Sequence, residues 1–166
     1  PKTLLFSCHS TVSSDDKFIV DTPKVHDKIN WGKINVPISE DKFNNIKAKM
    51  LAYLQNKKLY VFDGLAGANR MYTKKFRIVN ELASQNLFIH QLLIRPTDVE
   101  LEEYKPDYTI YAAPGFKCIP EVDGVHSEAA IIINYETKEV LIAGSQYSGE
   151  IKKSVFSVMN YELPFD

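Results

Sequence analysis

The sequence predicts an α/β domain in which helices flank a mixed β-sheet. Short runs of β-branched and aromatic residues are interspersed with stretches of helical periodicity, which is typical of this class. The length of 166 residues is enough for one substantial hydrophobic core. The chain contains no internal repeat, no low-complexity segment and no long Pro/Gly/Ser linker. We therefore expect residues 1–166 to form a single domain.

The amino-terminal third predicts one strand and one helix. The strand covers residues 17–20, KFIV, and ends at the following DTP. Ser39 begins the clearest helix, because serine is a good N-cap and two acidic residues follow it at the positive end of the helix dipole. An apolar stripe then recurs at helical spacing, formed by Phe43, Ile46, Met50 and Leu54.

The middle of the chain alternates between strand and helix signals. Residues 59–62, 76–79 and 108–111 are predicted strands, and residues 81–92 are predicted to be largely helical. Thr97 and Glu100 have the spacing of a capping box, so a short acidic helix is expected there. The glycine-rich residues 62–68, FDGLAGA, are expected to form a tight turn after the first of these strands.

The last third has the clearest pattern. Residues 129–134 and 139–143 predict two strands joined by a short polar turn, which together form a hairpin. After them, Gly149 relaxes the backbone where strand gives way to a final helix, within residues 147–164.

Composition and charge exclude several classes of function. Twenty basic and 21 acidic residues give a formal charge of −1, which offers no electrostatic case for binding nucleic acid or an anionic membrane. No apolar run approaches the ~20 residues needed to span a bilayer. Cys8 and Cys118 have no CxxC spacing, so we expect two free thiols in a reducing cytoplasm.

The segment YSGEIKK, residues 147–153, is the strongest candidate for chemistry. A helix N-terminus favours anions, whereas Lys152 and Lys153 in its first turn oppose the helix dipole. One interpretation is a pair of solvated lysines with Tyr147 half-buried. The other is an anion or carboxylate site that contains a lysine of lowered pKa. The sequence pattern leaves both interpretations open.

Other patterns favour structural roles. The G-x-x-x-x-G-K-[ST] pattern of a phosphate-binding loop is absent from the sequence. The four histidines lack metal-site spacing, and a triad around His126 or a catalytic pair of Asp123 and Glu128 is poorly supported. Residues 15–17, DDK, are expected to form an ordinary solvated turn.

Residues 147–164, YSGEIKKSVFSVMNYELP, closely resemble the Y-x-G-E-x-K-K-x-x-F-x-x-M-N-Y-x-L-P signature of ATP-dependent phosphoenolpyruvate carboxykinases. Five further stretches resemble motifs of that family in the same order, so that the resemblance covers about residues 15–164. They are WGKINVPIS at 31–39, FDGLAGA at 62–68, LIRP at 93–96, APGFK at 113–117 and SE at 127–128.

The resemblance implies a fold like the amino-terminal domain of these enzymes, and a reaction. Oxaloacetate and ATP give phosphoenolpyruvate, carbon dioxide and ADP, with Mn²⁺ or Mg²⁺ between the substrate and the nucleotide phosphates. Lys153 matches the family's manganese ligand, and a neutral amine is needed to offer that lone pair. Lys152 matches its partner in the motif. Tyr147 matches a tyrosine beside the substrate carboxylate, where its phenol donates a hydrogen bond.

Two departures from the family pattern affect the expected site. Residues 11–18 stand where the family has G-R-S-P-x-D-K-F, so Val12 occupies the position of an arginine that clamps the substrate carboxylate, and valine makes no such contact. Tyr72 and Thr73 stand where the family usually has Tyr-Arg. The family's phosphate-binding loop and remaining metal ligands follow the stretch that this chain matches.

We therefore expect an amino-terminal domain or fragment of an ATP-dependent phosphoenolpyruvate carboxykinase, a lyase of gluconeogenesis, without the carboxyl-terminal nucleotide domain. By itself the chain is expected to bind no ATP or metal and to be inactive. The alternative is a degenerate stand-alone homologue that acts as a non-catalytic binding or interaction module. If the nucleotide domain is missing, the surface around Tyr147, Lys153 and the last helix should expose apolar area.

Overall fold

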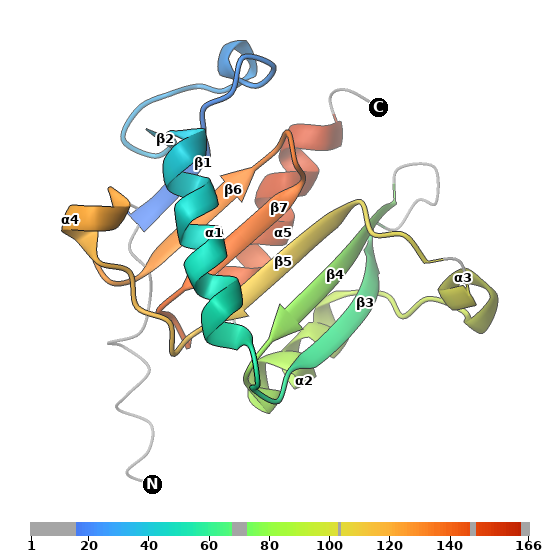
Figure 1. Ribbon diagram of the computed structural model, residues 1–166. Coiled ribbons are helices and arrows are strands. Elements are labelled where there is room, and N and C mark those ends of the chain that lie inside the picture. The colour runs from blue at the N-terminus through green and yellow to red at the C-terminus, as the bar shows by residue number, and fades with distance from the viewer. Residues whose placement is uncertain (1–15, 68–72, 103, 147–148, 164–166) are drawn as a thin grey trace, which may run out of the picture.

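The computed structural model describes residues 16–67, 73–102, 104–146 and 149–163. Within these residues, seven strands form one mixed sheet in the order β2-β1-β6-β7-β5-β4-β3 (Figure 1). The strands are β1 (Lys17–Val20), β2 (Val36–Ile38), β3 (Tyr60–Ala66), β4 (Lys74–Asn80), β5 (Tyr108–Ala113), β6 (Ala130–Asn134) and β7 (Glu139–Ala143). The predicted mixed sheet with flanking helices is confirmed.

The sheet has two halves that run in opposite directions. Strands β2, β1 and β6 are mutually parallel, and β7, β5 and β4 are mutually parallel. The halves meet at the predicted hairpin of β6 and β7, which is antiparallel with Ile132 opposite Leu141. At the far edge, β3 is antiparallel to β4. Because of this arrangement, β7 ends where β6 and β1 begin.

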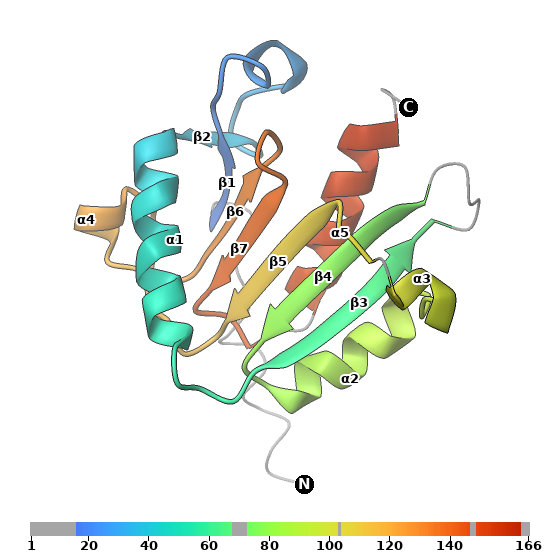
Figure 2. The same ribbon diagram turned by 45° about the vertical axis from the view of Figure 1, so that its right-hand side comes forward.

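Helices cover both faces of the sheet (Figures 1 and 2). Helix α1 (Glu40–Leu54) lies on one face, and α2 (Ala83–Leu92) and α5 (Gly149–Glu162) lie on the other. The short elements are η4 (His26–Lys28), α3 (Asp98–Glu102) and α4 (Pro120–Asp123). The core is accordingly divided into two apolar layers, one under α1 and the other under α2 and α5.

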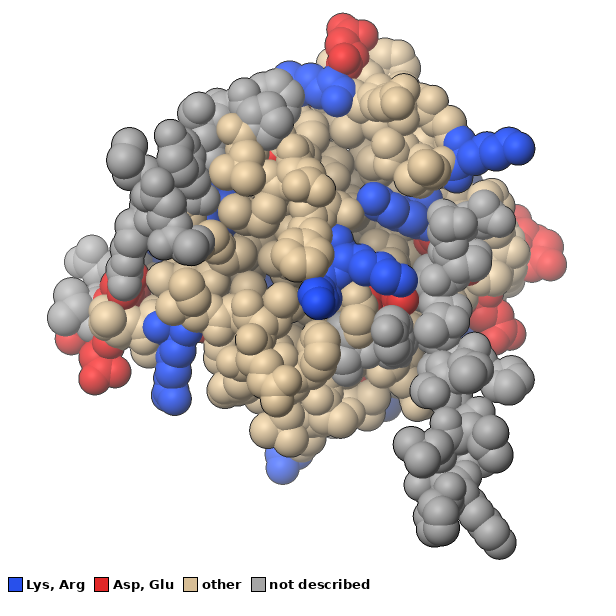
Figure 3. Space-filling view, turned by 180° about the vertical axis from the view of Figure 1, so that it is seen from behind, with Lys and Arg blue, Asp and Glu red and all other residues tan. Residues whose placement is uncertain are grey.

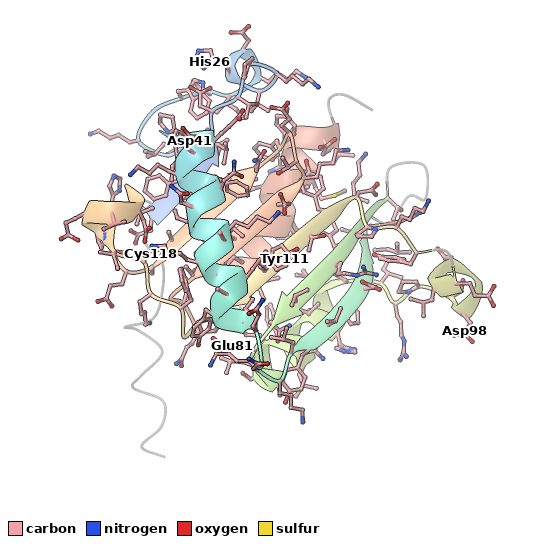
Figure 4. All side chains as sticks on the ribbon, in the orientation of Figure 1. His26, Asp41, Glu81, Asp98, Tyr111 and Cys118 are labelled. Carbon is pink, nitrogen blue, oxygen red and sulfur yellow. The ribbon has the colours of Figure 1, made fainter. Side chains whose placement is uncertain are left out.

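Helix α1 forms as its sequence predicts. The Ser39 hydroxyl accepts a hydrogen bond from the backbone N–H of Lys42, which satisfies one unpaired donor of the first turn. The four residues of the predicted apolar stripe are all buried against the sheet. At the other end, Tyr53 donates to Glu81, which also accepts from the backbone N–H of Gly115. Figure 4 labels Glu81 near this end of α1.

The short acidic helix α3 is also confirmed, together with its capping box. The backbone N–H of Glu100 donates to the Thr97 hydroxyl, and the Glu100 carboxylate accepts from the backbone N–H of Thr97. This reciprocal pair fixes the start of a helix that covers only five residues.

The prediction of a tight turn within residues 62–68 is wrong for its first part. Strand β3 continues through Asp63 and Gly64, which pair with Arg77 and Phe76 of β4. Asp63 and Arg77 form a cross-strand ion pair with 2.8 Å between Oδ1 and Nε. A Cβ atom at Gly64 would lie 2.7 Å from the Cβ of Leu93, so glycine here serves close packing. Strand β2 was not predicted, because it is short and contains Pro37.

Candidate functional site

The connection from β7 to α5 positions the start of the last helix. Gly144 has a φ of 71°, and a Cβ atom there would lie 2.7 Å from the backbone oxygen of Glu128. Only glycine fits this left-handed turn without strain. The turn follows the end of β7, where Ala143 pairs with Ala130 at the start of β6, and Glu150 of α5 lines the same cavity as Ile131 of β6.

Lys153 lies near the start of α5 and is mostly exposed to solvent. Its side chain is 64% exposed, and its Nζ atom lies 3.4 Å from Oε1 of Glu150. The Glu150 side chain is only 1% exposed, so the ion pair joins a buried carboxylate to an exposed amine. Metal ligation would favour a desolvated lysine, whereas Lys153 is exposed to solvent in the part of the chain that the structure describes.

The other two predicted site residues are Lys152 and Tyr147. Lys152 is exposed, and its Nζ lies 5.7 Å from the centre of the Phe156 ring. Tyr147 lies outside the described residues, as does Val12 at the position of the family arginine. At the second departure from the family pattern, the Thr73 hydroxyl donates to the backbone oxygen of Gly67, and Tyr72 lies outside the described residues.

Lys153 borders a cavity of about 410 Å³ between β1, β6 and α5. Its floor is formed by apolar side chains of β6, and its rim by polar and apolar residues of α5. Figure 3 shows the side of the molecule on which α5 lies, where lysine and arginine side chains stand near the middle of the face. The lining residues are Lys17, Ile34, Ile131, Ile133, Glu150, Lys153, Ser154, Phe156, Ser157 and Asn160.

Lys17 is the functional candidate that sequence reasoning missed. It is half-buried, and its Nζ donates to the Ser157 hydroxyl at 3.1 Å. Burial lowers the pKa of Lys17 below its usual value, because a low-polarity environment disfavours the charged amine. The alternation of side chains along β1 could have identified this lysine. Lys17 and Ile19 are two positions apart, so they share the face of the strand that lies under α5, and Lys17 points inward.

The expectation of an ordinary solvated turn at residues 15–17 is therefore wrong for its last two residues. Asp16 is 8% exposed and accepts a hydrogen bond from Ser127 at 3.0 Å. Ser127 thus has a structural partner, and the neighbouring His126 packs against the Phe18 ring with 5.0 Å between ring centres. Asp16 and Lys17 are held by side chains more than a hundred positions away, which local sequence does not indicate.

The described residues do not form a complete metal site. They contain no group of three or more His, Cys, Asp or Glu side chains placed to hold a metal ion. Glu150 and Lys153 offer one carboxylate and one amine, whereas Mg²⁺ takes about six ligands. A divalent ion at Lys153 would need ligands from elsewhere.

Two other expectations are tested by the structure. Phe156 on α5 is 52% exposed and Ile34, which lines the same cavity, is 69% exposed, so two apolar side chains are exposed at this cavity. Cys118 is a buried free thiol, and burial raises its pKa to about 12. No helix in the described ranges is long and apolar enough to cross a membrane.

Comparison with known proteins agrees with the motifs. The family model described as phosphoenolpyruvate carboxykinase matches residues 5–166. Among the relatives is the phosphoenolpyruvate carboxykinase (ATP) of Fusobacterium nucleatum, which is 59% identical over 152 residues. Proteins of the same name from Moorella thermoacetica and Bacillus cytotoxicus are 55% and 53% identical. Each alignment covers 92% of this chain but 29% of the relative. The chain thus spans less than a third of the length of these relatives, and it belongs to the phosphoenolpyruvate carboxykinase family.

Proposed function

We propose that this chain supplies the substrate side of an ATP-dependent phosphoenolpyruvate carboxykinase. The complete reaction converts oxaloacetate and ATP to phosphoenolpyruvate, carbon dioxide and ADP. The observation that carries the proposal is the start of α5, where the matched Y-x-G-E-x-K-K pattern places Lys153 at the mouth of a cavity beside buried Glu150. The names of the relatives, phosphoenolpyruvate carboxykinase (ATP), support the same reaction.

In this proposal the residues of the chain bind and orient the substrate. Lys153 offers its amine toward a divalent metal whose remaining ligands lie outside the described residues, and the metal with ATP supplies charge neutralisation and the phosphoryl group. Lys152 adds a second positive charge in the same turn. Tyr147 donates a hydrogen bond to the substrate carboxylate without adding charge.

The chain is expected to be inactive when isolated, because it lacks the parts that bind the nucleotide. Its sequence contains no phosphate-binding loop pattern, and the partner that would hold the nucleotide is a separate domain in this proposal. The purified chain, incubated with oxaloacetate, ATP and Mn²⁺, should form no phosphoenolpyruvate detectable by ³¹P NMR. Formation of phosphoenolpyruvate would show that the chain is a complete enzyme.

A chimera tests the role of the chain in the reaction. Residues 5–166 of this chain would replace the matching segment of the Fusobacterium nucleatum relative, which is 59% identical. The chimera should form phosphoenolpyruvate, and Lys153→Met should lower the rate ~100-fold or more, as loss of an important metal-site residue does. Lys105→Met, at an exposed position, is the matched control and should leave the rate unchanged.

A folded but inactive chimera would favour the alternative, a non-catalytic binding or interaction module, and Val12→Arg then separates two causes. If that substitution restores activity, the missing arginine explains the inactivity, because a guanidinium binds a carboxylate in two places. If it does not, the carboxykinase proposal is wrong for this chain.

We also propose a cytoplasmic location, where a reducing environment keeps Cys118 as the free thiol that it is here.

A further inference from the structure

The cavity beside α5 contains a lysine whose charge is not balanced by a carboxylate among the described residues. Lys17 stands at the first position of β1, opposite Ile131 of β6, and its Nζ points to Ser157 on α5. An ammonium group has three hydrogen-bond donors, and the described residues accept one of them. No carboxylate among the described residues lies within 4.0 Å of this nitrogen.

Two other partly buried lysines differ from Lys17 in this respect. Lys47 forms an ion pair with Glu139, and Lys49 forms one with Asp123. Each of these lysines is therefore neutralised by a carboxylate in the folded chain. Lys17 has a neutral hydroxyl in the corresponding place, although burial already disfavours its charged form.

The charged residues that face the cavity leave it positive. They are Lys17 on β1 and Glu150 and Lys153 on α5. The carboxylate of Glu150 lies beside Lys153, so its charge is directed to that amine. The formal charges of the three side chains leave one positive charge in the cavity, which a ligand with one negative charge would balance.

The apolar walls of the cavity indicate the chemical character of the rest of the ligand. Ile131 and Ile133 form an apolar floor, and Phe156 adds an exposed aromatic ring at the rim. The volume of about 410 Å³ lies within the range of small-molecule sites, which combine mostly apolar walls with a few polar anchors. A carboxylate with a short apolar chain matches this combination of one cationic anchor and an apolar floor.

We propose that this cavity binds a small monocarboxylate, with its carboxylate on Lys17 and Ser157 and its apolar chain on Ile131 and Ile133. The carboxylate is anchored by Lys17 and Ser157, whereas Glu150 and Lys153 of the YSGEIKK segment line the same cavity. Binding at this anchor requires neither metal nor nucleotide. Its existence does not depend on the carboxykinase reaction.

NMR of the purified chain tests this site with sodium butyrate as the probe, at constant ionic strength. The Lys17 side-chain signals and the Ser157 amide should shift and saturate, whereas butyramide, which has the same shape without the charge, should cause no saturable shift. Lys17→Met should weaken butyrate binding at least tenfold. Lys105→Met, on an exposed loop, should leave it unchanged.

Three results would overturn the proposal: shifts that grow linearly without saturation, saturable shifts that persist in Lys17→Met, or saturable shifts centred on Lys153. If Lys17→Met does not fold, Ser157→Ala provides the second variant, because it removes the hydroxyl and leaves the lysine in place. This variant should also weaken butyrate binding, and unchanged affinity in it would contradict the assigned carboxylate position.

Discussion

Helices α1 and α5 lie on opposite faces of the same sheet and bury their inner faces differently (Figures 1 and 2). The buried residues of α1 are all apolar: Phe43, Ile46, Met50 and Leu54. The buried residues of α5 include Glu150 and Ser154 beside its apolar ones, and both of these polar residues lie in the first half of the helix. One helix completes a core, whereas the other also places polar groups at a cavity.

The buried polar residues of α5 show that the start of this helix does more than fill the core. A buried carboxylate costs free energy unless it is paired or hydrogen-bonded, so Glu150 is more than a space-filling residue. Glu150 pairs with Lys153 at the end of α5 that borders the cavity. Around α1, Lys47 and Lys49 instead pair with carboxylates of the central strand β7 and of α4, and these ion pairs join neighbouring elements.

The largest expected effect is on the free energy of unfolding, and it appears when an inward residue of α1 and an outward residue of α5 are each replaced by alanine. Ile46→Ala should lower the free energy of unfolding by ~2–5 kcal/mol, because it leaves a cavity in a fully buried layer. Phe156→Ala should change it by no more than about 0.5 kcal/mol, because the ring is half exposed. Urea denaturation measures both. Equal losses for the two variants would mean that α5 is as firmly packed on its outer side as α1 is on its inner side.

The next effect concerns the turn that leads into α5. Gly144→Ala should lower the free energy of unfolding by ~1–3 kcal/mol, since the new Cβ meets the backbone of Glu128 in a left-handed conformation. Gly32→Ala is the matched control, because nothing lies within 4 Å of its Cβ position. Thermal melts followed by circular dichroism compare the two. If both variants melt alike, the turn does not constrain the start of α5.

The smallest effect is the pH dependence contributed by Lys17. Its pKa in the folded chain is lowered below 10.5, so the unfolded chain binds more protons in the window just under that value. The destabilisation from Lys17 is fully present at lower pH and is relieved as pH rises through this window. The stability of Lys17→Met relative to the native chain should therefore be greatest near neutral pH and should shrink toward pH ~10.

Urea denaturation at a series of pH values measures that difference. Comparing the two chains cancels the contributions of Cys118 and of buried tyrosines such as Tyr104, whose raised pKa values act in both. A stability difference that stays constant with pH would contradict the burial of the Lys17 amine. A difference that grows with pH would mean that the folded chain stabilises the charged form.

Sequence reasoning succeeded where structure depends on neighbouring residues. The Ser39 cap, the stripe of α1 and the Thr97–Glu100 box all rest on contacts within a few positions, and the structure confirms them. It failed at Gly64, whose role depends on Leu93 across the sheet edge, and at Asp16, whose partner is Ser127. In both cases the deciding contact joins distant parts of the chain, which local pattern does not show.

The sequence by itself determined the family and most of the helices and strands, because motifs and short-range periodicity depend only on residues that are close in the sequence. It also identified Lys153 as a candidate. Only the tertiary structure placed Lys17 at the same cavity, 140 positions from its partner Ser157. The physical reason is the sheet order: β1 and β6 pair as neighbours, and α5 packs across them, so that an inward lysine of the first strand meets the last helix.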